Sequence, residues 1–302
     1  MTQPRQVIPG RTYLISRRCT QRQHLLRPDR HVEQIYLYCL GEAVARYDVT
    51  LHGFVAMSNH QHLVVRDNHG NFPAFLAHFH KMVAKAVNAY RGRWENLWAT
   101  EQPNAVYLVE ADDRFDKLIY LLSNPVADHL VERLVDWPGA SSFGQHVRGE
   151  ARKVSRPRGF FREHGPMPAE VTLRLEPLDG FEHLAPAEWA AKIVAAVRAA
   201  EAKAKAARAR SGMRVLGRKA VLRTEPSSSP RTDEPRRGLR PHIASRNPER
   251  RASELGALLA FRIAYRNARR RWTGGAPRTL FPPGTYQLAA LGVRCGSLPL
   301  RS

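Results

Sequence analysis

The fold is decided by residues 50–67, which read TLHGFVAMSNHQHLVVRD. Residues 50–58 and 62–67 are rich in β-branched and aromatic side chains, and so little separates them that they predict the two strands of a β-hairpin. The turn is expected near Met57–Asn59. The motif His60-Gln61-His62 stands at the start of the second strand.

Strands and helices alternate on both sides of this hairpin. Apolar periodicity predicts further strands over 11–19 and 104–110, and helices over 29–48, 73–91 and 114–124. Asp113 resembles the start of the last helix, and Pro125 is expected to end it. The order β-α-β-β-α-β-α predicts an α+β fold of the ferredoxin-like, split βαβ kind, with an antiparallel sheet and one added helix. Two helices would cover one face of that sheet and leave the other open for a site.

The positive charge is concentrated in the second half of the chain. The formal net charge is +21, yet residues 1–150 hold 17 Lys and Arg against 15 Asp and Glu, whereas the remainder holds 31 against 12. Such an excess favours a polyanionic partner, and the plainer alternative is a solvated tail. These changes in charge and composition along the chain predict four segments. We expect a first domain over 1–148, a basic helical extension over 149–223, a Pro/Ser/Arg linker over 224–247 and a basic C-terminal helical segment over 248–302.

Several classes of protein are disfavoured by the sequence. No apolar run reaches the about 18 residues of a spanning helix, and the first residues lack the apolar stretch of a signal peptide. The three cysteines form no CxxC pair, and neither GxxxxGK[ST] nor GxSxG occurs. We therefore expect a cytoplasmic protein without a membrane partner, a disulfide framework, a P-loop or a serine-hydrolase elbow.

The two histidines of the motif are candidate metal ligands. Because side chains alternate along a strand, His60 and His62 share one face and Gln61 takes the other. His78 and His80 repeat the spacing on a predicted helix, where positions two apart do not face each other, so no role is assigned to them.

The helix that ends before Pro125 supplies a second set of polar groups. Tyr120 lies roughly 150° from the middle of the apolar stripe of this helix, and Asn124 follows one turn later on the same side. A tyrosine that only packs in the core would lie on the apolar stripe of the helix. Tyr120 is therefore a candidate nucleophile, with an ordinary exposed tyrosine as the alternative.

Together these groups suit a metal-assisted phosphodiester transfer. Two imidazoles and an amide oxygen can hold Mg²⁺ or Mn²⁺, which would neutralise charge on the scissile phosphate. Tyr120 would attack the phosphorus atom. Free tyrosine is protonated at neutral pH, so a nearby cation such as Lys117 could help to form the phenolate.

At this point the sequence resembles the single-tyrosine HUH transposases, in particular the REP-associated tyrosine transposases of bacteria. The resemblance covers about residues 8–145 and rests on GRTYLISRRC, FVAMSNHQHLVV and YLLSNPVADHLVERLVDWPGASS. It implies that His60 and His62 bind the metal, that Asn124 is the third ligand and that Tyr120 is the nucleophile. Residues 1–148 would then be the catalytic domain.

The family cleaves and joins single-stranded DNA beside hairpins through a 5′-phosphotyrosine, in association with the bacterial nucleoid. Gln61 departs from the family pattern, in which a bulky apolar residue points into the core. We expect its amide to reach a backbone partner.

Single-stranded DNA requires a basic groove with aromatic side chains for base stacking. The candidate contacts are Arg17, Arg18, Arg22, Arg91, Arg93, Trp94 and Trp98, with Tyr13 interleaved. Trp137 is expected to pack against the end of the catalytic helix. The alternatives to a transposase are a domesticated protein that binds DNA hairpins without cutting and a regulatory RNA-binding protein; the sequence does not decide between monomer and homodimer.

Overall fold

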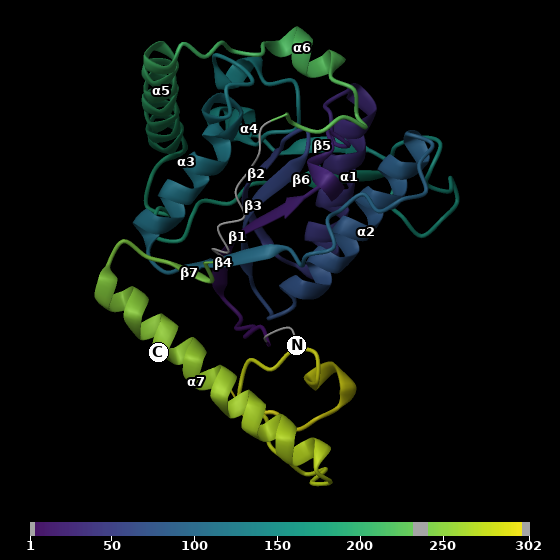
Figure 1. Ribbon diagram of the computed structural model, residues 1–302, viewed down its shortest axis with the longest axis vertical. Helices are drawn as coiled ribbons and strands as arrows, with labels where there is room; N and C mark the ends of the chain where they lie inside the picture. Colours follow the sequence, from purple (N-terminus) through teal and green to yellow (C-terminus); the bar gives the residue numbers. More distant parts are fainter. Residues whose placement is uncertain (1–3, 232–240, 298–302) are drawn as a thin grey trace.

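The computed structural model describes residues 4–231 and 241–297 and places one mixed sheet at the centre of the molecule (Figure 1). Its strands are β1 (Arg11–Arg18), β2 (Thr50–Ala56), β3 (His60–Asp67), β4 (Asn104–Leu108) and β7 (Ile243–Ala244). They lie in the order β2-β3-β1-β4-β7. The first four pair antiparallel, and the short β7 adds to β4 in parallel. The hairpin and its turn lie where the sequence places them, whereas β7 was not predicted.

Helices lie on both faces of this sheet, so the chain is a mixed α/β protein. The helices are α1 (Arg30–Tyr47), α2 (Phe72–Tyr90), α3 (Ala111–Ala127), α4 (Phe143–Arg148), α5 (Pro186–Ser211), α6 (Arg218–Arg223) and α7 (Pro248–Thr273). Short 3₁₀ turns occupy Thr20–Arg22, Leu134–Asp136 and Ala289–Leu291. None of these described helices is both long and apolar enough to cross a bilayer.

The alternation of side chains along β1 and β3 separates two cores. Tyr13 and Ile15 pack with α1 and α2 on one face, while Leu14 and Val64 pack with α3 on the other. The second face is therefore covered in its middle by α3. The face that we expected to be open is thus largely covered, since Thr12 and His62 near its two ends are also buried.

Gln61 enters the first core and finds side-chain partners there. The Tyr36 hydroxyl lies 2.9 Å from its Oε1, and Nε2 of His80 lies 3.1 Å from its amide nitrogen. Arg17 in turn donates to Nδ1 of His80 at 3.0 Å. Burial, with the neighbouring Arg17 charge, holds the pKa of His80 well below its usual value, so the ring is neutral.

One expectation about this core was wrong. Gln61 reaches side chains rather than a backbone partner, because α2 turns His80 toward the sheet. His78 also has a partner, since its Nε2 lies 2.6 Å from Oε2 of Glu42. With Nδ1 of the neutral His80 accepting from Arg17, its Nε2 donates, so the Gln61 amide satisfies both neighbours when its oxygen faces His80 and its NH2 group faces the Tyr36 hydroxyl. Such pairing keeps a polar residue at position 61 compatible with an apolar core.

The third helix is longer than predicted at both ends. It begins at Ala111, and Glu110 rather than Asp113 precedes it. The Asp113 carboxylate accepts from the Glu110 backbone N–H at 3.2 Å, as the third residue of a capping box. Pro125 lies in the last turn, where it removes one backbone donor without ending the helix.

The region 149–223 contains more than basic helices. Two strands, β5 (Arg152–Ser155) and β6 (Glu170–Leu173), pair antiparallel and contact α1. The helix α5 packs on α3 and α4, and buries Trp189, Ile193 and Val197 in the second core. Of the expected linker, residues 232–240 lie outside the described residues, and β7 occupies part of the rest.

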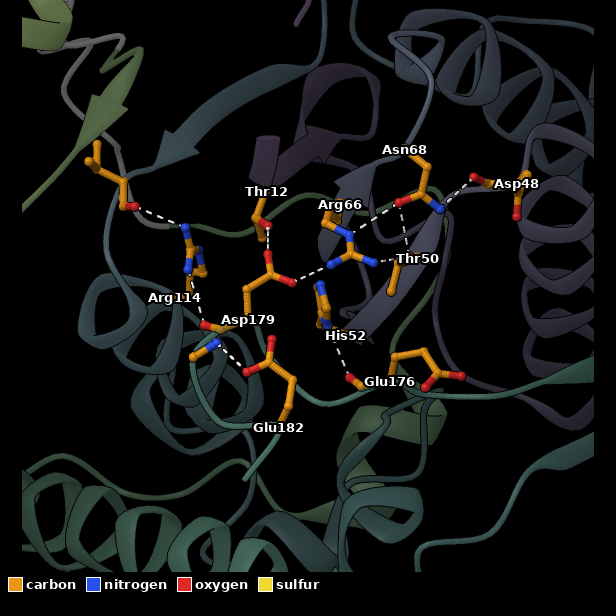
Figure 2. A network of polar contacts seen from close by, with 12 residues as sticks. Thr12, Asp48, Thr50, His52, Arg66, Asn68, Arg114, Glu176, Asp179 and Glu182 are labelled. Carbon is orange, nitrogen blue, oxygen red and sulfur yellow. Dashed lines mark hydrogen bonds and ion pairs between the residues drawn. The ribbon is translucent and has the colours of Figure 1, made fainter. Parts of the chain in front are cut away.

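A polar network fastens the segment before α5 to one end of the sheet (Figure 2). The Asp179 carboxylate accepts from Thr12 at 2.9 Å and from Arg66 at 2.5 Å. Arg114 of α3 donates to the Asp179 carbonyl at 3.0 Å. Because one residue contacts β1, β3 and α3, the network fixes where α5 begins relative to α3.

A buried histidine joins α4 to α5. The Trp189 indole N–H donates to Nδ1 of His146 at 3.2 Å. Burial lowers the pKa of His146 to about 3, with a smaller contribution from the neighbouring His52. The ring is therefore neutral in the folded protein over the whole range above that pH.

Replacing Gly53 by alanine will destabilise the fold. A Cβ at this position of β2 would lie 2.4 Å from Cδ1 of Leu118, a fully buried α3 side chain. Overpacking of this kind costs about 1–3 kcal/mol, which urea unfolding would measure. Gly256→Ala on α7 is the control, since nothing lies within 4 Å of its Cβ. Equal effects of the two substitutions would contradict the close α3–β2 contact.

The free energy of unfolding will fall in acid because of His146. Its folded pKa of about 3 lies below the unfolded value of roughly 6.5, so its contribution is complete above pH 6.5 and is lost as pH falls toward 3. The slope from this residue is about 1.4 kcal/mol per pH unit within that window. In His146→Gln the pH dependence should be shallower than in the wild type. An unaltered slope in His146→Gln would refute this assignment.

Candidate active site

The two histidines of β3 face α3 at the end of the sheet opposite the Asp179 network. In the antiparallel register His60 lies opposite Arg18 and His62 lies opposite Ser16, while Arg66 lies opposite Thr12. The ring centroids of His60 and His62 are 4.9 Å apart. The structure therefore brings the two imidazoles together on one face, as their spacing predicts.

Each imidazole is oriented by a hydrogen bond at its Nδ1 atom. Asn59 Oδ1 lies 2.7 Å from Nδ1 of His60, and Ser16 Oγ lies 2.7 Å from Nδ1 of His62. Bonds of this type fix the ring orientation and leave Nε2 for another partner, as in many metal sites. Neither partner was identified from the sequence. The pairing register of β1 with β3 would have pointed to Ser16.

Tyr120 and Asn124 come from α3 and meet the histidines. Oδ1 of the buried Asn124 lies 3.1 Å from Nε2 of His60. The Tyr120 ring lies 5.7 Å from the His62 ring between centroids, and 48 % of the residue is exposed. Lys117 places its ammonium group 5.7 Å from the centre of the Tyr120 ring. One surface thus combines two imidazoles, an amide, a phenol open to solvent and a cation.

The environment keeps His62 uncharged. Burial is the main cause that lowers its pKa well below 6.5, and His60 and the Arg18 charge add to it. A neutral imidazole retains a lone pair and can act as a metal ligand. The same burial makes a positive charge on this ring unfavourable.

These residues fit a divalent metal ion. The Asn59 oxygen can only accept, so Nδ1 of His60 carries a proton, and in the neutral ring Nε2 presents its lone pair to the Asn124 oxygen. With the amides oriented as in the structure, two acceptors face each other at 3.1 Å, an arrangement that a cation between or beside them would stabilise. Within residues 4–231 and 241–297, no cluster of three His, Cys, Asp or Glu side chains offers an alternative metal site.

Three predicted DNA contacts lie near this site or on the free surface. Arg18 is exposed beside His60, and the Arg22 carbonyl accepts from the Asn59 side chain at 3.2 Å. Trp94 is 99 % exposed in the loop after α2. That loop returns to the site end of β1, where the Ala99 N–H donates to the Arg18 carbonyl at 3.0 Å. Arg18, Arg22 and Trp94 remain candidates for binding a strand.

Other predicted contacts belong to the protein interior. Trp98 is 6 % exposed and its indole donates to the His80 carbonyl, so the expectation of base stacking there was wrong. Arg91 donates to the carbonyls of Leu25 and Arg27. Arg17 contacts His80, and Arg93 is half-buried. Tyr13 stacks on Phe72, and Trp137 packs in the core that holds α3. The packing of Trp137 is as expected. For the others, the sequence pattern could not separate structural side chains from exposed ones.

Comparison with known proteins adds two distant structural likenesses. No family model matches the chain, and no curated protein matches it either. Among solved structures, it is similar to a REP-associated tyrosine transposase bound to a REP hairpin, at 18 % identity and a TM-score of 0.42, over 54 % of this chain and 88 % of that one. It is also similar to a putative transposase from Deinococcus radiodurans R1, at 15 % identity and a TM-score of 0.29, over 41 % of this chain and 97 % of that one. At such low TM-scores, any functional conclusion has to come from the site itself.

Proposed function

We propose that this chain is a single-tyrosine HUH transposase with a ferredoxin-like catalytic domain, which cleaves and rejoins single-stranded DNA beside hairpins. The observation that carries the proposal is the meeting of Tyr120 with His60, His62 and Asn124 on one surface. A phenol beside two oriented, metal-competent imidazoles has the groups that phosphodiester transfer requires.

In the proposed cleavage step, Tyr120 acts as the nucleophile. Its Oη forms a bond to the scissile phosphorus while the bond from phosphorus to the 3′ oxygen breaks. The phenolic proton passes by way of solvent to the departing 3′ oxygen, and the product is a 5′-phosphotyrosine. Joining is the reverse reaction with a new 3′ hydroxyl, so no nucleotide cofactor is consumed.

The side chains around the tyrosine prepare this step. Lys117 supplies positive charge beside the ring that must become a phenolate. Asn59 and Ser16 hold the imidazoles in place, and the partial burial of the site strengthens electrostatic interactions. His60, His62 and Asn124 would hold Mg²⁺ or Mn²⁺, which when bound polarises the scissile phosphate.

Replacing Tyr120 by phenylalanine will abolish covalent attachment to DNA. A labelled hairpin oligonucleotide with a single-stranded flank, incubated with Mg²⁺ or Mn²⁺, should give a protein–DNA adduct in denaturing gels with wild type only. Binding should change less than about threefold, since only one hydroxyl is removed. Tyr90→Phe is the matched control, because Tyr90 is 45 % exposed and stacks on His31 away from the imidazole pair. An adduct that persists in Tyr120→Phe would rule out this nucleophile, and wild-type binding without any adduct would favour a non-cleaving hairpin-binding or RNA-binding protein.

Removing His62 will weaken metal binding, which can be read without DNA. In a Mn²⁺ titration followed by electron paramagnetic resonance, His62→Ala should raise the Kd at least about tenfold. Ser16→Ala should also raise it about tenfold, because partners behind a ligand contribute roughly 10–100-fold in affinity. His69→Ala is the control, since His69 is exposed and bonded to Asp48. The metal assignment fails if His62→Ala and His69→Ala bind Mn²⁺ equally well.

A further inference from the structure

The last third of α7 carries a cluster of arginines that form no ion pair with any of the described residues. Arg266, Arg269, Arg270 and Arg271 are all exposed, and Arg278 follows in the adjoining loop. No acidic residue occurs in the sequence after Glu254. We call these five residues the α7 arginine cluster.

Several arginines elsewhere in the protein are paired with carboxylates. Arg11 contacts Glu254, Arg46 contacts Glu42, and Arg152 contacts Glu33. In the part of the chain that the structure describes, no ion pair involves a member of the α7 arginine cluster. Like charges that share one end of a helix repel one another, and a bound polyanion would relieve that repulsion.

The aromatic side chains of this region pack mainly against one another, although Trp272 keeps 36 % of its surface exposed. Tyr265 packs against Phe261 and Phe281, and Trp272 also packs against Phe281. Single strands are held by aromatic platforms that alternate with basic residues. Guanidinium groups without such platforms instead suit the regular phosphate backbone of a duplex.

The pattern on α7 also differs from that of a membrane-surface helix. Its exposed apolar residues Leu255, Leu259 and Ile263 precede the α7 arginine cluster along the axis. An interfacial helix would carry its apolar and basic faces side by side over its whole length. The charge at the end of α7 therefore favours a polyanion that needs no apolar contact.

We propose that the α7 arginine cluster binds the sugar–phosphate backbone of double-stranded DNA as a second surface, separate from the site around Tyr120. That the duplex is DNA rather than RNA rests on the proposed function. Figure 1 shows α7 along the lower edge of the molecule, with α5 and α6 at the upper end. Arg246, just before α7, anchors the start of this helix beside α3. The backbone N–H of Arg246 donates to Asp113 at 2.8 Å, and the Arg246 guanidinium pairs with Asp116. A duplex held by this surface would thus be tied to the helix that carries Tyr120.

The test is the salt dependence of duplex binding by the full-length protein. The probe is a fluorescent, blunt-ended 20-base-pair DNA duplex, titrated in EDTA so that no metal-dependent step takes place. Arg266→Gln/Arg269→Gln/Arg270→Gln should raise the Kd at least tenfold at 150 mM KCl. It should also flatten the plot of log K against log salt by about 2–3 units, because each phosphate contact contributes about 0.9.

A matched control removes the same charge elsewhere. Lys203→Gln/Lys205→Gln/Arg210→Gln takes three exposed cations from α5 and should change the duplex Kd less than threefold. Lysine at the three α7 positions should preserve most of the affinity, since point charges suffice for phosphate. Circular dichroism would establish that each variant is folded.

Three outcomes would overturn the proposal. The first two are an unchanged duplex Kd in the α7 variant and an equal loss of duplex affinity in the α5 control. The third is an α7 variant that loses binding to vesicles containing phosphatidylserine but keeps its affinity for the duplex. The α7 glutamine variant should still form the Tyr120 adduct on a single-stranded substrate. Failure of duplex binding and failure of the tyrosine chemistry are therefore read in separate experiments.

Discussion

The pairing of β1 with β3 is the constraint on which the rest of the structure depends. Its register places Ser16 beside His62 and, because side chains alternate, turns both imidazoles toward α3 while Gln61 enters the opposite core. A slip of one residue would exchange the two faces and bury the histidines among α1 and α2. The contacts of Gln61 with Tyr36 and His80 oppose such a slip, since they would leave buried polar groups unpaired.

The same face of the sheet has three parts with different tasks. The Asp179 network fastens one end, the apolar contact of α3 fills the middle, and the histidines, Tyr120 and Asn124 meet at the other end. Since α5 packs behind α3, the second half of the chain helps to hold the helix that carries the tyrosine. The basic region is therefore part of the framework of the site as well as a source of charge.

The sequence predicted the parts of this arrangement that depend on local periodicity. Strand alternation placed His60 and His62 together, and helical spacing placed Tyr120 with Asn124. It did not reveal long-range partners, so it missed Ser16, β7 and the role of His80, and it misjudged Trp98. A basic or aromatic residue looks the same in sequence whether it lies in a core or on a surface. The metal, the nucleophile and the DNA substrate stay predictions that solution experiments can test.

The most direct measurement is peptide mapping by mass spectrometry after the wild-type protein reacts with a hairpin oligonucleotide and Mn²⁺. The account predicts a single modified peptide in which the oxygen of Tyr120 carries the 5′-phosphate of the cleaved strand. A phosphate linkage on another residue, or a cleaved strand with no protein attached, would contradict it.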